Sequence, residues 1–143
     1  MTSMIGRSAL AALACTFAVA VATPSMAEMV NMKAALSAKS EVPPNDSTAS
    51  GNVTVTYDTA SKKLTWKGTY TGLSGAATAA HFHSGEAGKN GGVAVPIAPA
   101  TSPLDGSATL TDAQAADLMA GKLYVNIHTA KNPGGELRGQ VVK

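Results

Sequence analysis

Two neighbouring segments of the chain alternate apolar and polar residues with a period of two. Residues 51–57, GNVTVTY, place two valines and a tyrosine on one face, and residues 64–70, LTWKGTY, continue the same alternation. A period of two is that of a β-strand with one buried face, because successive side chains of a strand point to opposite sides. Residues 58–62, DTASK, lie between the segments and favour a turn. The pair therefore predicts an antiparallel hairpin, and with it a fold built from sheet.

One later segment has the pattern of a helix instead. The Thr111 hydroxyl can cap a helix while Gln114 reaches back to the cap, and Gly121 suits a left-handed stop. Glycines and prolines punctuate the remaining chain, as is typical of small all-β domains. We expect an all-β fold, an antiparallel β-sandwich or barrel-like Greek-key domain with one short helix near residues 112–120. Two further strands are expected at residues 123–129 and 135–142.

The N-terminal segment has the composition of a secretory signal peptide. Arg7 precedes an uncharged, alanine-rich run over residues 8–22, and residues 25–27, SMA, form an A-x-A-like cleavage site. This pattern predicts a signal peptide over residues 1–27 and one mature domain over residues 28–143.

Cleavage of the signal peptide would determine the cysteine content and the charge of the mature domain. Removal of the first 27 of 143 residues leaves 116, the size of one domain, and takes away Cys15, the only cysteine. Ten basic side chains then face nine acidic ones without a basic cluster, which argues against a nucleic-acid partner. A membrane anchor is the alternative for the apolar run, but the run is short and no charge cluster follows it. We expect an exported protein, periplasmic or secreted, with no stable membrane anchor after cleavage.

The three histidines of the chain, His81, His83 and His128, fall on the polar side of their strands. In residues 80–83, AHFH, and in residues 123–129, LYVNIHT, the alternate positions are apolar. Two histidines at i and i+2 lie about 6.5 Å apart along a strand, which lets both rings reach one ion with bonds of about 2 Å. A third histidine from a neighbouring strand would complete a three-histidine site for copper or zinc, because imidazole suits both ions. A solvated, metal-free group of histidines is the alternative.

Four blocks of the chain together resemble the chordin-type domain, CHRD. They are residues 36–44 (LSAKSEVPP), 80–91 (AHFHSGEAGKNG), 121–129 (GKLYVNIHT) and 132–140 (NPGGELRGQ). The blocks span nearly the whole expected domain. The departures from the family pattern are mild: Phe82 and Ile127 replace other apolar residues, and Gly92 stands where proline is usual.

The resemblance implies a β-rich domain of a kind found in exported bacterial proteins and in an animal extracellular antagonist of growth factors. It attaches no general catalytic activity to the domain. The site residues that the motifs carry over are His81, His83 and His128, with Glu41, Glu136 and Arg138 beside them.

Three functions are compatible with these residues. The first is non-enzymatic binding of copper or zinc by the histidines, with Glu41 or Glu136 as a fourth ligand or an outer partner. The second is a metal-free structural or protein-interaction module of the cell envelope, in which Arg138 forms an ion pair with a carboxylate such as Glu41. A metal-dependent or hydrolytic enzyme ranks last, because Ser84 and His83 are adjacent on a strand and point to opposite faces. We expect the first function, and the sequence does not identify an envelope or extracellular partner protein.

Overall fold

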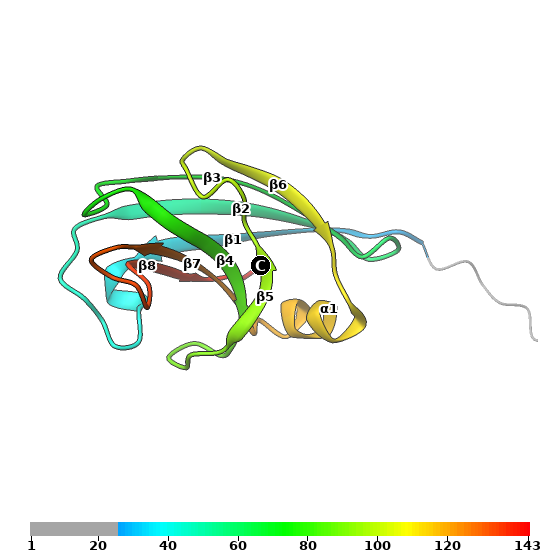
Figure 1. Ribbon diagram of the computed structural model, residues 1–143. Helices are drawn as coiled ribbons and strands as arrows, with labels where there is room; N and C mark the ends of the chain where they lie inside the picture. Colours follow the sequence, from blue (N-terminus) through cyan, green and yellow to red (C-terminus); the bar gives the residue numbers. More distant parts are fainter. Residues whose placement is uncertain (1–25) are drawn as a thin grey trace, which may run out of the picture.

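The computed structural model describes residues 26–143, and the expected signal peptide lies almost wholly outside them. This part of the chain forms eight strands, a short 3-10 turn and one α-helix (Figure 1). In chain order the elements are β1 (Met29–Ser37), η1 (Ala38–Ser40), β2 (Ser50–Asp58), β3 (Lys63–Thr71), β4 (Ala77–Ser84), β5 (Gly92–Pro96), β6 (Leu104–Thr109), α1 (Asp112–Met119), β7 (Leu123–Thr129) and β8 (Leu137–Gln140). Among these residues, no helix has the length and apolar character needed to cross a membrane.

All eight strands belong to one sheet that curls into a nearly closed barrel (Figure 1). The strand order is β5-β4-β7-β8-β1-β2-β3-β6, and every pairing between neighbours is antiparallel. The expected all-β, barrel-like fold with one short helix is confirmed, as a single sheet rather than the two sheets of a sandwich. Strands β5 and β6 form the two edges. The edge at β5 is partly covered by α1, because Gln114 Nε2 donates to the Ala94 carbonyl oxygen at 2.7 Å.

The local predictions for the hairpin and the helix are confirmed. Strands β2 and β3 pair with Tyr57 opposite Leu64, as their alternation requires. Helix α1 begins with the expected capping box, in which the Thr111 hydroxyl accepts from the Gln114 backbone and the Gln114 side chain accepts from the Thr111 backbone. Gly121 follows the helix with φ of 71°, the left-handed conformation that ends it.

The apolar side of the alternation faces the interior of the barrel. Five of the residues that fill the interior are at most 3% exposed: Trp66, Phe82, Val125, Ile127 and Leu137. Trp66 on β3 and Phe82 on β4 meet edge to face with ring centroids 5.2 Å apart. These two strands are not neighbours in the sheet, so the aromatic pair joins opposite parts of the barrel through the core.

The last strand is shorter than the sequence pattern predicts. A strand was expected over residues 135–142, and β8 covers only Leu137–Gln140. Gly135 has φ of 134°, which L side chains rarely adopt, and a Cβ there would collide with the side chains of Asn126 and Glu41. The chain therefore enters the sheet only after this glycine.

The outer face of β4, β7 and β8 is buried, whereas strand alternation alone predicts a solvent-facing polar side. Four polar or amphipathic side chains on or beside these strands are at most 3% exposed: Tyr124, Asn126, Glu136 and Arg138. We refer to these four residues together with Glu41 as the polar layer. Residues 38–49 and residues 85–91 form two loops that cover it, and Asn90 Nδ2 joins the loops by donating to the Val42 carbonyl oxygen at 2.8 Å. Strand alternation thus gives the direction in which these side chains point but not their exposure.

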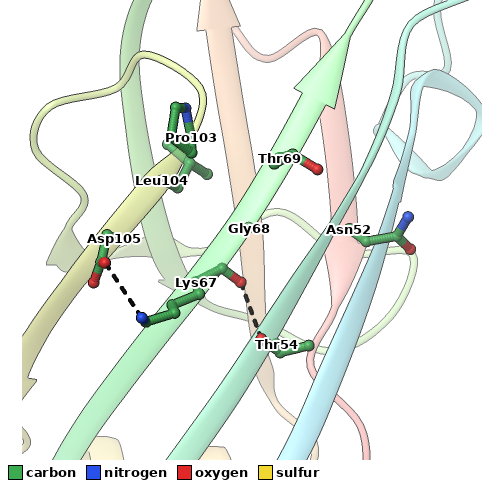
Figure 2. Close-up of a pocket in the computed structure, with 8 residues that line it drawn as sticks. All are labelled: Asn52, Thr54, Lys67, Gly68, Thr69, Pro103, Leu104 and Asp105. Atoms are coloured by element: carbon green, nitrogen blue, oxygen red, sulfur yellow. Dashed lines mark hydrogen bonds and ion pairs between the residues drawn. The ribbon is translucent and has the colours of Figure 1, made fainter.

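A hollow of about 410 Å³ lies on a different part of the barrel surface (Figure 2). It lies over β2, β3 and the start of β6, where Gly68 contributes no side chain. Lys67 and Asp105 at its rim form an ion pair at 3.7 Å, and Thr54 donates to the Lys67 carbonyl oxygen at 3.2 Å. No histidine lines this hollow, so it is separate from the histidine residues singled out in the sequence.

Candidate metal centre

Strand pairing brings the three histidines together. His81 and His83 lie on β4, and His128 lies on β7, the strand that pairs with β4 (Figure 1). His128 is opposite Ala79, two residues before His81. One ring nitrogen of each histidine lies within 4.8 Å of the others. The expectation that a neighbouring strand supplies the third histidine of one cluster is confirmed.

His83 is the most buried of the three, and one of its ring nitrogens has no partner. Its Nδ1 donates to the Gly91 carbonyl oxygen at 3.0 Å, and its ring stacks on Tyr124 with centroids 5.0 Å apart and planes inclined by 9°. Because Nδ1 carries the proton in that bond, Nε2 keeps its lone pair. His83 Nε2 is buried and makes no hydrogen bond within residues 26–143. A buried ring nitrogen with a free lone pair, on an imidazole fixed by a carbonyl, is the arrangement that metal-ligating histidines show.

His128 and His81 face each other across the strand pair. His128 Nδ1 donates to the Pro133 carbonyl oxygen at 3.0 Å, which leaves Nε2 as the nitrogen facing the cluster. That Nε2 lies 3.2 Å from His81 Nδ1. At this distance the two neutral rings form one hydrogen bond, in which His81 Nδ1 donates and the lone pair of His128 Nε2 accepts. A metal ion that used both nitrogens would displace this proton.

The surroundings favour neutral rings on β4. Burial, then the neighbouring His128 and His83 rings, lowers the pKa of His81 below its ordinary value of 6.5. Burial also lowers the pKa of His83, although its bond to Gly91 acts in the other direction. Neutral imidazole is the form that binds a metal ion, so these two residues need release no proton from a charged ring at neutral pH.

The cluster lies where the covered face meets solvent. His83 is 9% exposed, while His81 and His128 are half-buried. Three imidazole nitrogens are fewer than the four ligands of a tetrahedral ion, so a water molecule or another ligand would fill the remaining position. Solvent reaches the cluster past the two half-buried rings.

Arg138 does not form the ion pair that was expected from the sequence. Within residues 26–143, no carboxylate oxygen lies within 4.0 Å of its guanidinium group. Its Nη2 donates to the carbonyl oxygens of Glu86 and Lys89, and its Nη1 donates to Asn90 Oδ1. The guanidinium carbon lies 3.6 Å from the centroid of the Tyr124 ring. Arg138 therefore binds a loop and an aromatic face where a carboxylate was expected.

Glu41 belongs to the polar layer rather than to the histidine cluster. Its Oε1 accepts a hydrogen bond from Asn126 Nδ2, and Asn126 also donates to the Leu137 carbonyl oxygen at 2.9 Å. Burial raises the pKa of Glu41 to about 7, although the bond from Asn126 and the positive charge of Arg138 act to lower it. Glu41 is absent from the group of side chains whose ligand atoms lie within 4.8 Å of one another.

Glu136 likewise lies outside the group of ligand atoms that the histidines form, and its oxygens are occupied by other donors. Its two carboxylate oxygens accept bonds from the hydroxyl groups of Ser47, Ser74 and Thr129, each at 2.6 Å, and from the Ser74 backbone at 2.8 Å. Burial alone would raise the pKa of Glu136, but these four donors lower it to about 2. Glu136 thus stays charged and joins the loop of residues 38–49 to β7.

The groups that orient the histidine rings were missed by sequence reasoning. Two are the carbonyl oxygens of Gly91 and Pro133, and backbone groups carry no signal of their own in a sequence. The third, Tyr124, shares a strand face with His128 four residues further on, so the alternation of β7 already placed it beside the cluster.

Together the geometry defines a small barrel-like β domain with a three-histidine cluster at the edge of a covered polar face. The model of the CHRD domain family matches residues 32–141, most of the chain, and the chain therefore belongs to the CHRD domain family. Comparisons with curated proteins and with solved structures gave no match.

Proposed function

We propose that this CHRD domain is an exported, non-enzymatic metal-binding protein that holds copper or zinc through His81, His83 and His128. The observation that carries the proposal is His83 Nε2, a buried nitrogen without a hydrogen-bond partner in residues 26–143 that is directed by the bond from Nδ1 to Gly91. Leaving a buried acceptor unpaired costs about 1–3 kcal/mol, which a metal–nitrogen bond would recover.

The donor set restricts the class of ion. Three imidazole nitrogens suit zinc and copper(II), whereas calcium and magnesium require oxygen ligands. Copper(II) binds a given nitrogen site more tightly than zinc in the general affinity order of these ions. When bound, either ion would supply one position for an exchangeable ligand on the solvent side. The residues of the chain would hold the ion by His83 Nε2, His128 Nε2 and His81 Nδ1.

A metal-free structural or interaction module of the cell envelope is the second candidate. The observation that favours it is the bond of 3.2 Å between the rings of His81 and His128, since these nitrogens already satisfy each other without an ion. This function leaves His83 Nε2 unexplained. The two candidates differ in one measurable respect, the affinity of the metal-free protein for an ion.

A calorimetric titration of the metal-free mature protein with zinc and with copper(II) at pH 7.5 tests the proposal. We expect about one ion per chain, and a loss of affinity in His83→Ala and His128→Ala beyond the roughly 10–100-fold typical of an outer partner. Thr78→Ala, a change at an exposed position of the same strand, is the matched control and should bind like the parent protein. Binding that survives the loss of either histidine would contradict a shared site and favour the metal-free module.

Export is tested separately. The apolar run and residues 25–27 support cleavage after Ala27, so N-terminal sequencing of the protein recovered outside the cytoplasm should begin at Glu28. Recovery of a membrane-bound product that retains residues 1–22 would exclude a soluble exported domain.

A further inference from the structure

We infer that Arg138 is a positioning residue for the metal centre: it fixes the loop and the aromatic ring that orient His83, without contacting the ion. The inference rests on the proposed function, since it names the residue that prepares that same site. It follows from three sets of contacts that connect the guanidinium group with the His83 ring, two through a loop and one through Tyr124.

The first set ties Arg138 to the loop of residues 85–91. Its Nη2 donates to the carbonyl oxygens of Glu86 at 2.9 Å and Lys89 at 2.8 Å, and its Nη1 donates to Asn90 Oδ1 at 3.2 Å. Arg138 is only 2% exposed. A buried cation must be compensated by its hydrogen-bond partners, and here the partners on the loop take that role in place of a carboxylate.

The second set ties the same loop to His83. Gly91, two residues after Lys89, accepts the bond of 3.0 Å from His83 Nδ1 through its carbonyl oxygen. A Cβ on Gly91 would collide with the Ser84 carbonyl group, so this close approach of the loop to β4 requires glycine. The orientation of the acceptor for His83 therefore depends on where Arg138 holds the loop.

The third set passes through Tyr124. Strand β7 lies between β4 and β8, so Tyr124 has His83 on one side and Arg138 on the other. The guanidinium carbon lies 3.6 Å from the ring centroid, and the His83 ring stacks on the same tyrosine at 5.0 Å. The Tyr124 hydroxyl also accepts from the Gly91 backbone at 3.1 Å. The ring and the loop thus restrain His83 together, and Arg138 contacts both.

Arginine suits this position better than lysine. Its planar group directs donors to three acceptors at once while stacking on an aromatic face, whereas an ammonium group has neither the fork nor the plane. We therefore expect Arg138→Lys to keep only part of the zinc affinity, and of the preference for a proton on His83 Nδ1, that Arg138→Met loses.

Nuclear magnetic resonance of the metal-free protein and zinc titration together test this inference. Two-bond proton–nitrogen correlations at pH 8 report which ring nitrogen of each histidine carries the proton. The parent protein should show His83 protonated at Nδ1, and Arg138→Met should show a mixture of both forms with zinc affinity about 10–100-fold lower. Arg138→Lys should fall between the two. Lys39→Met removes an exposed cation from the same surface hollow as Arg138 and should change neither measurement.

The outcomes separate the inference from the proposed function. If the parent protein binds neither zinc nor copper(II), the proposed function fails, and the His83 correlations alone still decide whether Arg138 orients the ring. If Arg138→Met does not fold, Asn90→Ala, which releases the same loop from Arg138 and from Val42, replaces it with the same expected direction. A variant that only melts at a lower temperature, with His83 still protonated at Nδ1 and zinc affinity unchanged, would overturn the positioning role.

Discussion

The two outer faces of the barrel have the same strand alternation but opposite environments. On β2, β3 and β6 the polar side chains stand in solvent, and the Lys67–Asp105 pair there is 73% and 66% exposed. On β4, β7 and β8 the corresponding side is covered by the loops of residues 38–49 and 85–91, and Arg138 and Asn126 are almost inaccessible. Polar groups on the first face need no partner from the protein, because water supplies one. Those on the second must be satisfied by the chain itself.

Coverage by loops is therefore what turns a polar strand face into a candidate site. A covered face keeps water from its polar groups, lowers the pKa of the histidines beside it and requires the chain to supply the hydrogen-bond partners. The difference between the faces yields four predictions, from the largest expected effect to the smallest.

Glu136→Gln should lower the free energy of unfolding at pH 7 by about 3 kcal/mol. The pKa of Glu136 is about 2 in the folded protein against an ordinary 4.5, and each pKa unit corresponds to about 1.4 kcal/mol. Because the folded pKa is lowered, this stabilisation is complete above pH 4.5 and is lost as the pH falls towards 2. Urea unfolding at pH 7 and at pH 3 measures the cost and the loss of more than half of it at the lower pH.

Asp46→Asn is the matched control for this change. Asp46 lies in the same loop as Ser47 but is exposed, so its replacement should leave the unfolding curves nearly unchanged. An equal effect of the two variants would mean that the hydrogen bonds to the Glu136 carboxylate are not the source of the stability.

The sequence predicted the parts of this molecule that depend on local pattern. The alternation of β2 and β3, the capping box at Thr111 and the common face of His81 and His83 each depend on residues close together in the chain. The clustering of His128 with these two histidines could also be predicted from the sequence, because it requires only that β7 lies next to β4.

The remainder depends on contacts between distant segments that no local pattern encodes. The partners of Arg138 are backbone carbonyls of a loop about fifty residues away, and those of Glu136 are serines from two other loops. Strand parity assigned both residues to the polar face correctly. It could not show that loops cover this face, because parity describes direction and not exposure.

Glu41→Gln should act in the opposite direction, raising the free energy of unfolding at pH 8 by about 3 kcal/mol. Burial raises the pKa of Glu41 to about 7, so folding favours its protonated form. The stability that protonated Glu41 contributes to the folded protein is present in full below pH 4.5 and is lost as the pH rises through 7. A glutamine cannot ionise, so the variant does not lose this stability. Unfolding of both proteins at pH 4 and pH 8 measures the difference, which should be present only at the higher pH. A loss of zinc affinity in Glu41→Gln would instead assign Glu41 to the metal centre as a ligand.

Zinc affinity should fall about tenfold between pH 7.5 and pH 5.5, equivalent to about 1.4 kcal/mol, because the ligands must be neutral to bind. Burial and neighbouring rings lower the pKa values of His81 and His83, so most of the decrease should occur below pH 6.5. Titrations across this range on the parent protein give the midpoint. A decrease of about a thousandfold over this range, which three rings with the ordinary pKa of 6.5 would give, would show that the rings are solvated like those on an open face. In that case the coverage of the β4 side would have no effect on the site.

Lys67→Met should change the free energy of unfolding by less than about 0.5 kcal/mol. The ion pair that it removes joins two well-exposed side chains at 3.7 Å, and pairs of this kind contribute little because water screens them and both side chains lose rotamer freedom. The substitution also leaves in place the Thr54 bond to the backbone of residue 67, which does not depend on the lysine side chain (Figure 2). Urea unfolding at pH 7 in low and in high salt is the measurement, with zinc titration as a second one in which the variant should match the parent protein. A cost above 1 kcal/mol that disappears in high salt would show that charges on the open face also stabilise the barrel. The two faces would then differ in the partners of their charged side chains, ion pairs on the open face and hydrogen bonds on the covered one, rather than in the exclusion of water.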